Sequence, residues 1–222
     1  MLTPQLGIIM LDTNFCRPKG DIGNPETFSF SVEYEVVKKA TIERVVKIAD
    51  STLIEPFIQA AKRLEYKGVK AITTSCGFLS LFQQEIQRQL TVPFFSSSLI
   101  QIPLVYNLTR GTVGVLTASK SNLTNKHFSA VNAHQIPIVM EGMDDMSAFT
   151  TAIVDETHPL DRNAVALEMK QVVLRLLENN HDIRAIVLEC TNMPPYRSII
   201  KEVTALPIFD INTLTNYVID SF

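Results

Sequence analysis

Residues 69–78 read VKAITTSCGF, and residues 183–192, which begin 114 positions later, read IRAIVLECTN. Without a gap, this offset pairs Cys76 with Cys190 and then Pro93 with Pro207. A single register that keeps a cysteine, a proline and several apolar positions indicates that the chain arose by internal duplication.

Each copy has the pattern of a strand–helix–strand unit. A short apolar run ends at the cysteine, which is typical of a buried parallel strand. An amphipathic helix is expected next, over 79–90 and 196–203, and then a second strand over 92–95 and 206–209. Further strands are predicted over 6–11 and 112–116, and further helices over 52–66 and from residue 161. Such βαβ units have right-handed crossovers almost always.

The sequence therefore predicts an α/β protein with two pseudo-symmetric lobes, each a mostly parallel sheet flanked by helices. The first lobe is expected over residues 1–110 and the second over 111–222, with the termini free to interleave. The offset is 107 between Gly7 and Gly114 but 114 between the cysteines. We assign the difference to an extra ordered loop in the first lobe, over the Pro/Gly-rich residues 16–30, and expect a binding loop there. The site is expected between the lobes, at the carboxyl ends of the strands.

Composition excludes several classes of function. The net charge of −3 provides no basic face, so we expect no nucleic-acid partner. No apolar run approaches the roughly 20 residues of a membrane span, and the first residues lack a signal-peptide pattern. We therefore expect a cytoplasmic protein without a membrane partner. Three cysteines are too few for a disulfide framework, and none has zinc-site spacing, so no metal is expected.

Two thiols at equivalent positions suit acid–base chemistry at carbon. One thiolate would remove a proton from one face of a substrate, and the opposite thiol would return a proton to the other face. Both cysteines precede a predicted helix, so amide N–H groups are expected to stabilise the thiolate or a substrate carboxylate. A lone cysteine at a strand end usually serves packing, but packing alone does not require a thiol in both copies.

These residues resemble the aspartate/glutamate/hydantoin racemase superfamily over nearly the whole chain. The resemblance rests on 73–78, TTSCGF, on 188–192, LECTN, and on the strands that begin at Gly7 and Gly114. It implies an enzyme without pyridoxal phosphate or another cofactor, a small carboxylate as substrate, and a homodimer. It also implies Cys76 and Cys190 as catalytic residues and a set of substrate-binding residues: Asp12, Asn14, Ser75, Gly77, Phe78, Thr117, Ser119, Thr191 and Asn192.

The chain departs from the amino-acid racemases beside both cysteines. There the first cysteine is typically followed by Asn-Thr, whereas this chain has Gly77-Phe78. Glu189 precedes the second cysteine, either as a charge that raises the pKa of Cys190 or as a buried group with a local partner.

The sequence leaves several functions open. An aspartate/glutamate-type racemase is the leading hypothesis. The alternatives are a hydantoin or allantoin racemase, a decarboxylase or isomerase of the same fold, a binding protein, and a thiol redox enzyme. Cys16 is interpreted as incidental, and Asp144 and Asp145 as a solvated turn. The histidines are expected on the surface: His127, His134, His158 and His181.

Overall fold

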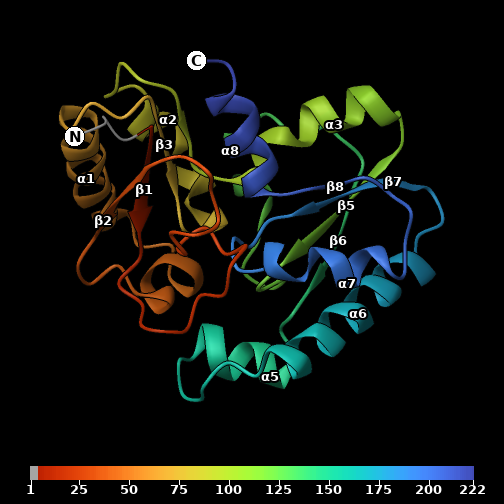
Figure 1. The fold of residues 1–222 in the computed structure, drawn as a ribbon. Helices are drawn as coiled ribbons and strands as arrows, with labels where there is room; N and C mark the ends of the chain where they lie inside the picture. The colour runs from red at the N-terminus through yellow and green to blue at the C-terminus, as the bar shows by residue number, and fades with distance from the viewer. Residues whose placement is uncertain (1–4) are drawn as a thin grey trace.

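In a computed structural model, which describes residues 5–222, the chain forms two four-stranded sheets, and every strand pairing is parallel (Figure 1). The first sheet has the order β2-β1-β3-β4, and its strands are β1 (Leu6–Met10), β2 (Val32–Val36), β3 (Ala71–Thr74) and β4 (Phe94–Phe95). The second has the equivalent order β6-β5-β7-β8, and its strands are β5 (Thr112–Thr117), β6 (Ile138–Gly142), β7 (Ile183–Leu188) and β8 (Ile208–Phe209).

The pairing register confirms the duplication. Gly7 of β1 pairs with Ile72 of β3, and Gly114 of β5 pairs with Ile186 of β7. These are the positions that the sequence offsets of 107 and 114 made equivalent. The edge strands β2 and β6 were missed from the sequence, because none of their residues except Gly142 is fully buried and their apolar runs are short.

Each cysteine is followed by a tight 3₁₀ turn and only then by a short α-helix. In the first lobe these are η3 (Gly77–Phe82) and α2 (Gln83–Gln87), and in the second η6 (Pro194–Tyr196) and α7 (Arg197–Lys201). The expected helices over 79–90 and 196–203 are therefore present but shorter than predicted. The other helices are α1 (Ile54–Tyr66), α3 (Ile102–Thr109), α4 (Asn125–Ala130), α5 (Ser147–Phe149), α6 (Arg162–Glu178) and α8 (Ile211–Ile219), with further 3₁₀ turns at η2 (Ser51–Leu53) and η4 (Ser98–Gln101).

The expectation of an extra loop in the first lobe is wrong. Gly7 and Cys76 are 76 − 7 = 69 residues apart, whereas Gly114 and Cys190 are 190 − 114 = 76 apart, so the second lobe is the longer one. The additional residues lie between β6 and β7, where the second lobe holds the long α6. The segment over 16–30 is nevertheless an ordered loop, since Asp21 and Ile22 are buried.

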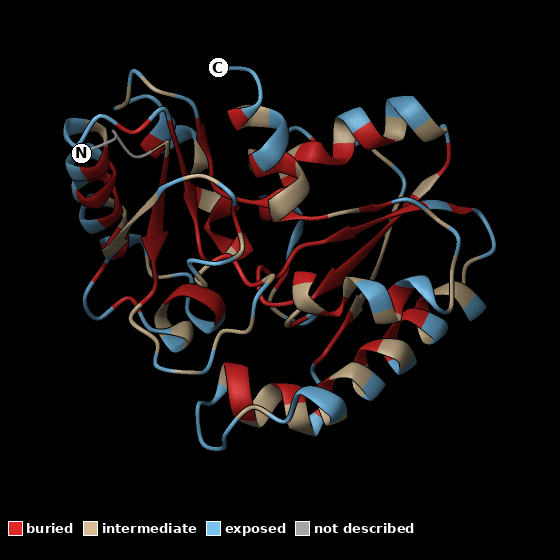
Figure 2. Ribbon diagram, in the orientation of Figure 1, coloured by how far each residue is buried: buried red, intermediate tan, exposed pale blue. Residues whose placement is uncertain are grey.

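The two lobes exchange their last helices. Val105 of α3, which ends the first half, packs in one apolar cluster with Val113 of β5 and Val187 of β7. Ile211 and Leu214 of α8, which ends the second half, pack with residues of the first sheet such as Ile8. Figure 2 shows the buried strands of both sheets beneath helices that expose their outer faces. The boundary near residue 110 thus separates the two sheets but not the helices that cover them.

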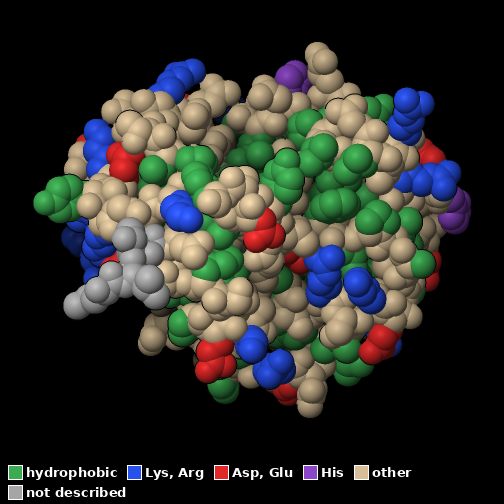
Figure 3. All heavy atoms as spheres, turned by 45° about the horizontal axis from the view of Figure 1, so that its top comes forward, with side chains coloured by type: hydrophobic (Ala, Val, Ile, Leu, Met, Phe, Trp, Pro, Cys, Tyr) green, Lys and Arg blue, Asp and Glu red, His purple; other side chains and the backbone are tan. Residues whose placement is uncertain are grey.

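Several large apolar side chains remain on the surface near these exchanged helices. Leu104 and Leu108 of α3 and Tyr217 of α8 are each at least half exposed. Figure 3, which brings the top of Figure 1 forward, shows hydrophobic side chains gathered on that face. None of the helices formed by residues 5–222 combines the length and the apolar character that a bilayer crossing requires.

Candidate active site

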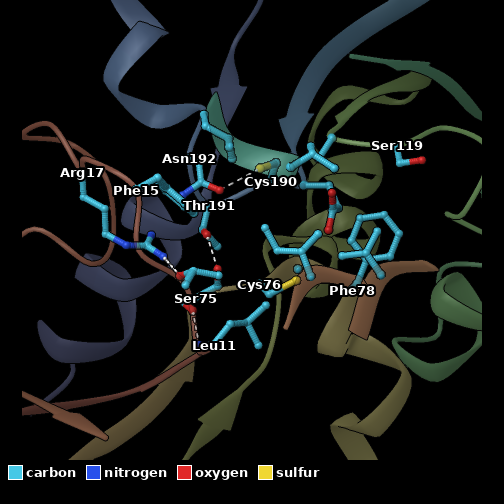
Figure 4. A pocket seen from close by; sticks show the side chains of 18 residues that line it. Leu11, Phe15, Arg17, Ser75, Cys76, Phe78, Ser119, Cys190, Thr191 and Asn192 are labelled. Carbon is cyan, nitrogen blue, oxygen red and sulfur yellow. Dashed lines mark hydrogen bonds between the residues drawn. The ribbon is translucent and has the colours of Figure 1, made fainter. Parts of the chain in front are cut away.

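A narrow cavity lies between the lobes, at the carboxyl ends of the strands, and both lobes contribute to it (Figure 4). It leaves about 40 Å³ of free space. One residue, Ser75, separates Cys76 from the end of β3. In the same way, Glu189 separates Cys190 from the end of β7. The remaining lining is mostly apolar and includes Leu11, Phe15, Ile42, Val46, Phe78, Ala118, Ile153 and Val154. Ligands of open parallel sheets bind at this edge, so the cavity is the candidate site.

The Cys76 thiol is held at the start of the turn η3. Cys76 itself has an extended backbone, its carbonyl oxygen accepts from the Leu79 N–H at 3.1 Å, and the backbone N–H groups of Phe78 and Leu79 lower the pKa of its thiol. Burial and the charge of Glu189 act in the opposite direction, and together they raise the pKa of Cys76 to about 12. The amide N–H groups expected from the sequence are therefore present, but desolvation outweighs them. Cys76 thus carries its proton at neutral pH.

The Cys190 thiol is part of a hydrogen-bonded chain that reaches the other lobe. Its sulfur donates to Oδ1 of Asn192 at 3.4 Å, and Nδ2 of Asn192 donates to Asp21 at 2.7 Å. Asp21 in turn accepts from Nη1 of Arg17 at 2.9 Å. Burial raises the pKa of Cys190 well above its ordinary range, and the nearby Glu189 and Cys76 raise it further. The network therefore holds Cys190 as a proton-bearing thiol.

Glu189 is a fully buried carboxylate at the cavity wall. Its Oε2 accepts a hydrogen bond of 2.8 Å from Thr117, while Oε1 has no hydrogen-bond partner among residues 5–222. Burial raises the pKa of Glu189 to about 7, although the hydrogen bonds from Thr117 and the Ala118 backbone lower it. Both interpretations left open by the sequence apply, since the group has a local partner and also raises the pKa of both thiols.

The structure brings together most, but not all, of the residues proposed from the sequence. Beside the two cysteines, six of them line the cavity: Ser75, Gly77, Phe78, Ser119, Thr191 and Asn192. Thr117 lies behind the wall, where it holds Glu189. Asp12 and Asn14 are outside the lining: Asp12 accepts from the backbone of Lys39, and the Asn14 backbone N–H donates to Glu156. Roles in substrate binding remain predictions for all of them.

Sequence reasoning missed Arg17 and the two walls formed by π-helical turns. Arg17 lies in the loop over 16–30, lines the cavity and stacks 4.2 Å from the centre of the Phe15 ring (Figure 4). The walls are η1 (Glu43–Lys47) and η5 (Thr150–Val154), which contribute Val46 and Ile153. These two residues are 107 positions apart, so the offset between the opening strands would have predicted them as a symmetric pair.

The expectation that His127 lies on the surface is wrong. Its side chain is buried, its ring packs edge-to-face against Phe78, and its Nδ1 accepts from the backbone N–H of Thr124 at 3.0 Å. Burial lowers the pKa of His127 to about 4, so the ring is neutral near pH 7. His127 therefore supports the cavity wall from behind. The other three histidines are exposed, as expected.

Two equivalent α/β lobes, each of which brings a free thiol to one shared cavity, define a pseudo-symmetric two-cysteine fold. The sequence model of the Asp/Glu/Hydantoin racemase family matches residues 38–215, and the chain belongs to this family. Among solved structures it is similar to glutamate racemase from Francisella tularensis in complex with D-glutamate. That likeness has a TM-score of 0.61 and 20% identity, and it covers 99% of this chain and 80% of the other.

Two curated relatives carry the name of a different reaction. A dimethylsulfoniopropionate lyase from Durusdinium sp. clade D is 28% identical over 98% of this chain. Dimethylsulfoniopropionate lyase 7 from Emiliania huxleyi is 31% identical over 96% of it. The chain spans 75% of the length of the first relative and 65% of the second. The fold and family are those expected from the sequence, whereas these relatives are lyases rather than isomerases.

Proposed function

We propose that the protein is a lyase that removes a proton next to a carboxylate and expels a neutral sulfide from the neighbouring carbon. Dimethylsulfoniopropionate, named in the relatives, has the required groups. A base takes the α-proton, the C–H electron pair forms the new C=C bond, and the C–S pair leaves with dimethyl sulfide. The products are acrylate, dimethyl sulfide and the protonated base, which returns its proton to water. Atoms and charge therefore balance without a cofactor.

The difference between the two thiols supports a reaction with one base. Cys190 donates its proton to Asn192 and is held as a thiol. The backbone N–H groups of Phe78 and Leu79 and the charge of Arg17 all lower the pKa of Cys76, whereas only the Asn192 backbone lowers that of Cys190, so the Cys76 thiolate is the better stabilised of the two. We assign Cys76 as the base. Because its pKa is high, its thiolate is scarce but strongly basic, as abstraction of a weakly acidic α-proton requires.

Arg17 is the group suited to the substrate carboxylate. It is the cation that lines the cavity, and its guanidinium is held by Asp21 and Thr13. These two hydrogen bonds fix the orientation of the planar guanidinium, whose remaining N–H groups can bind a carboxylate. As the α-carbon loses its proton, negative charge spreads onto the carboxylate, and Arg17 stabilises that charge.

Racemisation is the second candidate, and the symmetry of the site favours it. Cys76 and Cys190 occupy equivalent ends of β3 and β7 on either side of one cavity, as a two-base inversion requires. Inversion needs both thiols, whereas elimination needs only the base. The two reactions therefore respond differently to the loss of Cys190.

The test uses purified protein with dimethylsulfoniopropionate, and in parallel with L-aspartate and L-glutamate in D2O. We expect dimethyl sulfide in the headspace and acrylate by NMR, complete loss of both in Cys76→Ala, and retained, reduced release in Cys190→Ala. Cys16→Ser is the matched control, because this exposed thiol is outside the cavity. If the amino acids exchange their α-hydrogen with inversion and no sulfide is released, the protein is a racemase and the lyase proposal is wrong.

A further inference from the structure

Glu189 breaks the twofold symmetry of the site. Its equivalent in the first lobe, at the offset of 114, is Ser75. The Ser75 hydroxyl accepts a hydrogen bond of 3.0 Å from the backbone of Leu11, whereas Oε2 of Glu189 accepts one of 2.8 Å from the Thr117 hydroxyl. The first lobe therefore has one hydroxyl with a partner at this position, and the second lobe has a carboxylate with one oxygen bonded and the other unpartnered.

Gly77 provides the space for this carboxylate. A Cβ atom at residue 77 would overlap both Oε1 and the carbonyl oxygen of Glu189. Its equivalent, Thr191, does carry a side chain, which donates a hydrogen bond of 2.6 Å to the carbonyl oxygen of Ser75. Gly77 of the first lobe thus leaves free the space that the carboxylate of Glu189, from the second lobe, occupies. The departure from the racemase pattern at residue 77 and the presence of Glu189 form one structural feature.

The residue that carries the unpartnered oxygen is part of the cavity wall. Glu189 is among the lining residues, its side chain is 0% exposed, and Oε1 is without a hydrogen-bond partner in the part of the chain that the structure describes. Leaving such an atom unpaired costs roughly 1–3 kcal/mol or more for a charged group. A buried group of this kind calls for a reason, and a ligand that enters the cavity supplies one.

We propose that Glu189 selects substrates whose far end is a methylated cation, a sulfonium or a quaternary ammonium, by placing Oε1 against that charge. This inference deepens the proposed function and rests on it for the identity of the reacting substrate. An onium group has no N–H to donate, so it needs an anionic oxygen and apolar or aromatic neighbours rather than several acceptors. Phe78, Val46 and Ile153 provide such neighbours in the same cavity.

The arrangement also links binding to the reactivity of the base. The Glu189 charge raises the pKa of both Cys76 and Cys190, and Arg17 is the cation that acts against it at Cys76. A bound onium group neutralises Glu189 and removes that contribution. The Cys76 thiolate therefore forms more readily when an onium substrate is bound, and an analogue of the same shape without the positive charge lacks this effect.

Two unreactive probes separate charge from shape. β-Alanine betaine carries a trimethylammonium group at the sulfonium position, and 4,4-dimethylpentanoate has the same shape with carbon in place of nitrogen, so it keeps the carboxylate and lacks the positive charge. Calorimetric titration of the full chain is expected to give about tenfold tighter binding of the betaine, or roughly 1.4 kcal/mol. Glu189→Gln keeps the shape of the side chain and should remove this preference, while Glu189→Asp, which keeps the charge, should retain part of it. Glu55→Gln, on the exposed face of α1, is the control and should bind as wild type.

The outcomes distinguish this inference from the proposed reaction. Equal binding of both probes by the wild-type protein, or an unchanged preference in Glu189→Gln, would overturn the role of Glu189 even if dimethyl sulfide is released. A preference for the betaine that depends on Glu189 supports the inference even if no sulfide is released, and in that case the lyase reaction is what fails. Circular dichroism of each variant confirms that it is folded.

Discussion

Asn192 of the second lobe donates a hydrogen bond of 2.7 Å to Asp21 of the first, and the same Asn192 accepts from the Cys190 thiol. The orientation of a candidate catalytic group thus depends on a loop of the opposite lobe. Gly20 of that loop has a φ of 103° and lies against Pro195, so the loop approaches the turn after Cys190 closely.

Removing the carboxylate of Asp21 should destabilise the protein. Asp21→Ala leaves the Arg17 guanidinium, whose side chain is only 12% exposed, without its ionic partner and frees the Asn192 amide. We expect the free energy of unfolding in urea to fall by about 3 kcal/mol. Glu202→Ala removes an exposed partner of Lys170 and should cost no more than about 1 kcal/mol. Equal effects of the two substitutions would contradict a buried network.

Cys76 should be unreactive toward alkylation at neutral pH. Because burial and Glu189 raise its pKa to about 12, the thiolate that reacts with iodoacetamide is scarce below about pH 10. Mass spectrometry of the Cys16→Ser variant isolates the response of the two cavity thiols. In Glu189→Gln the onset of Cys76 alkylation should shift to lower pH, since one cause of the raised pKa is gone. An onset near pH 8.5 in the folded wild type would contradict this prediction.

The raised pKa of Cys76 should also make the folded state less stable at alkaline pH. A group whose pKa is raised in the folded state ionises first in the unfolded chain, so stability falls as the pH rises from roughly 8.5 toward 12. Cys76→Ala should flatten this part of the pH profile of the urea midpoint. Other groups that titrate in this range are common to both proteins, so the difference between the two profiles isolates Cys76.

Gly77 and Glu189 should show strong energetic coupling. Gly77→Ala forces a Cβ atom onto the Glu189 carboxylate and its carbonyl oxygen, and overpacking of this kind costs about 1–3 kcal/mol. Adding Glu189→Ser, which copies the residue found at the equivalent Ser75, relieves the overlap with the carboxylate. In a double-mutant cycle the two changes together should therefore destabilise less than Gly77→Ala alone. Additive effects would show that the two residues act independently.

His127 should make the folded state sensitive to acid. Its pKa is lowered to about 4, so the unfolded chain binds a proton first as the pH falls below roughly 6.5. The contribution of His127 to the free energy of unfolding is complete above that pH and decreases as the pH falls toward 4. At pH 4.5 the loss amounts to about 2–3 kcal/mol. Comparison of urea midpoints at pH 7.5 and 4.5 between wild type and His127→Gln measures the difference. His134→Gln, at an exposed position, should behave as wild type.

The sequence predicted the doubled architecture because a cysteine, a proline and two strand patterns recur at nearly constant offsets. It predicted the cavity at Cys76 and Cys190 because the strand ends are where parallel sheets bind ligands. It did not predict Arg17, which reaches the cavity from a loop through a pair with Asp21 that no local pattern specifies. It also misplaced His127, since burial behind Phe78 is a tertiary contact. The expected homodimer stays a prediction, which light scattering of the purified protein tests.

The exchange of α3 and α8 gives the molecule the connectivity of a domain-swapped dimer joined into one chain. Each half keeps its partner's sheet covered, so neither half completes its own core. A chain divided after residue 110 should accordingly give two fragments that reassemble when they are expressed together and aggregate when they are expressed apart. By the same logic, a hinge motion that opened the lobes would have to separate α3 and α8 from the sheets that they cover.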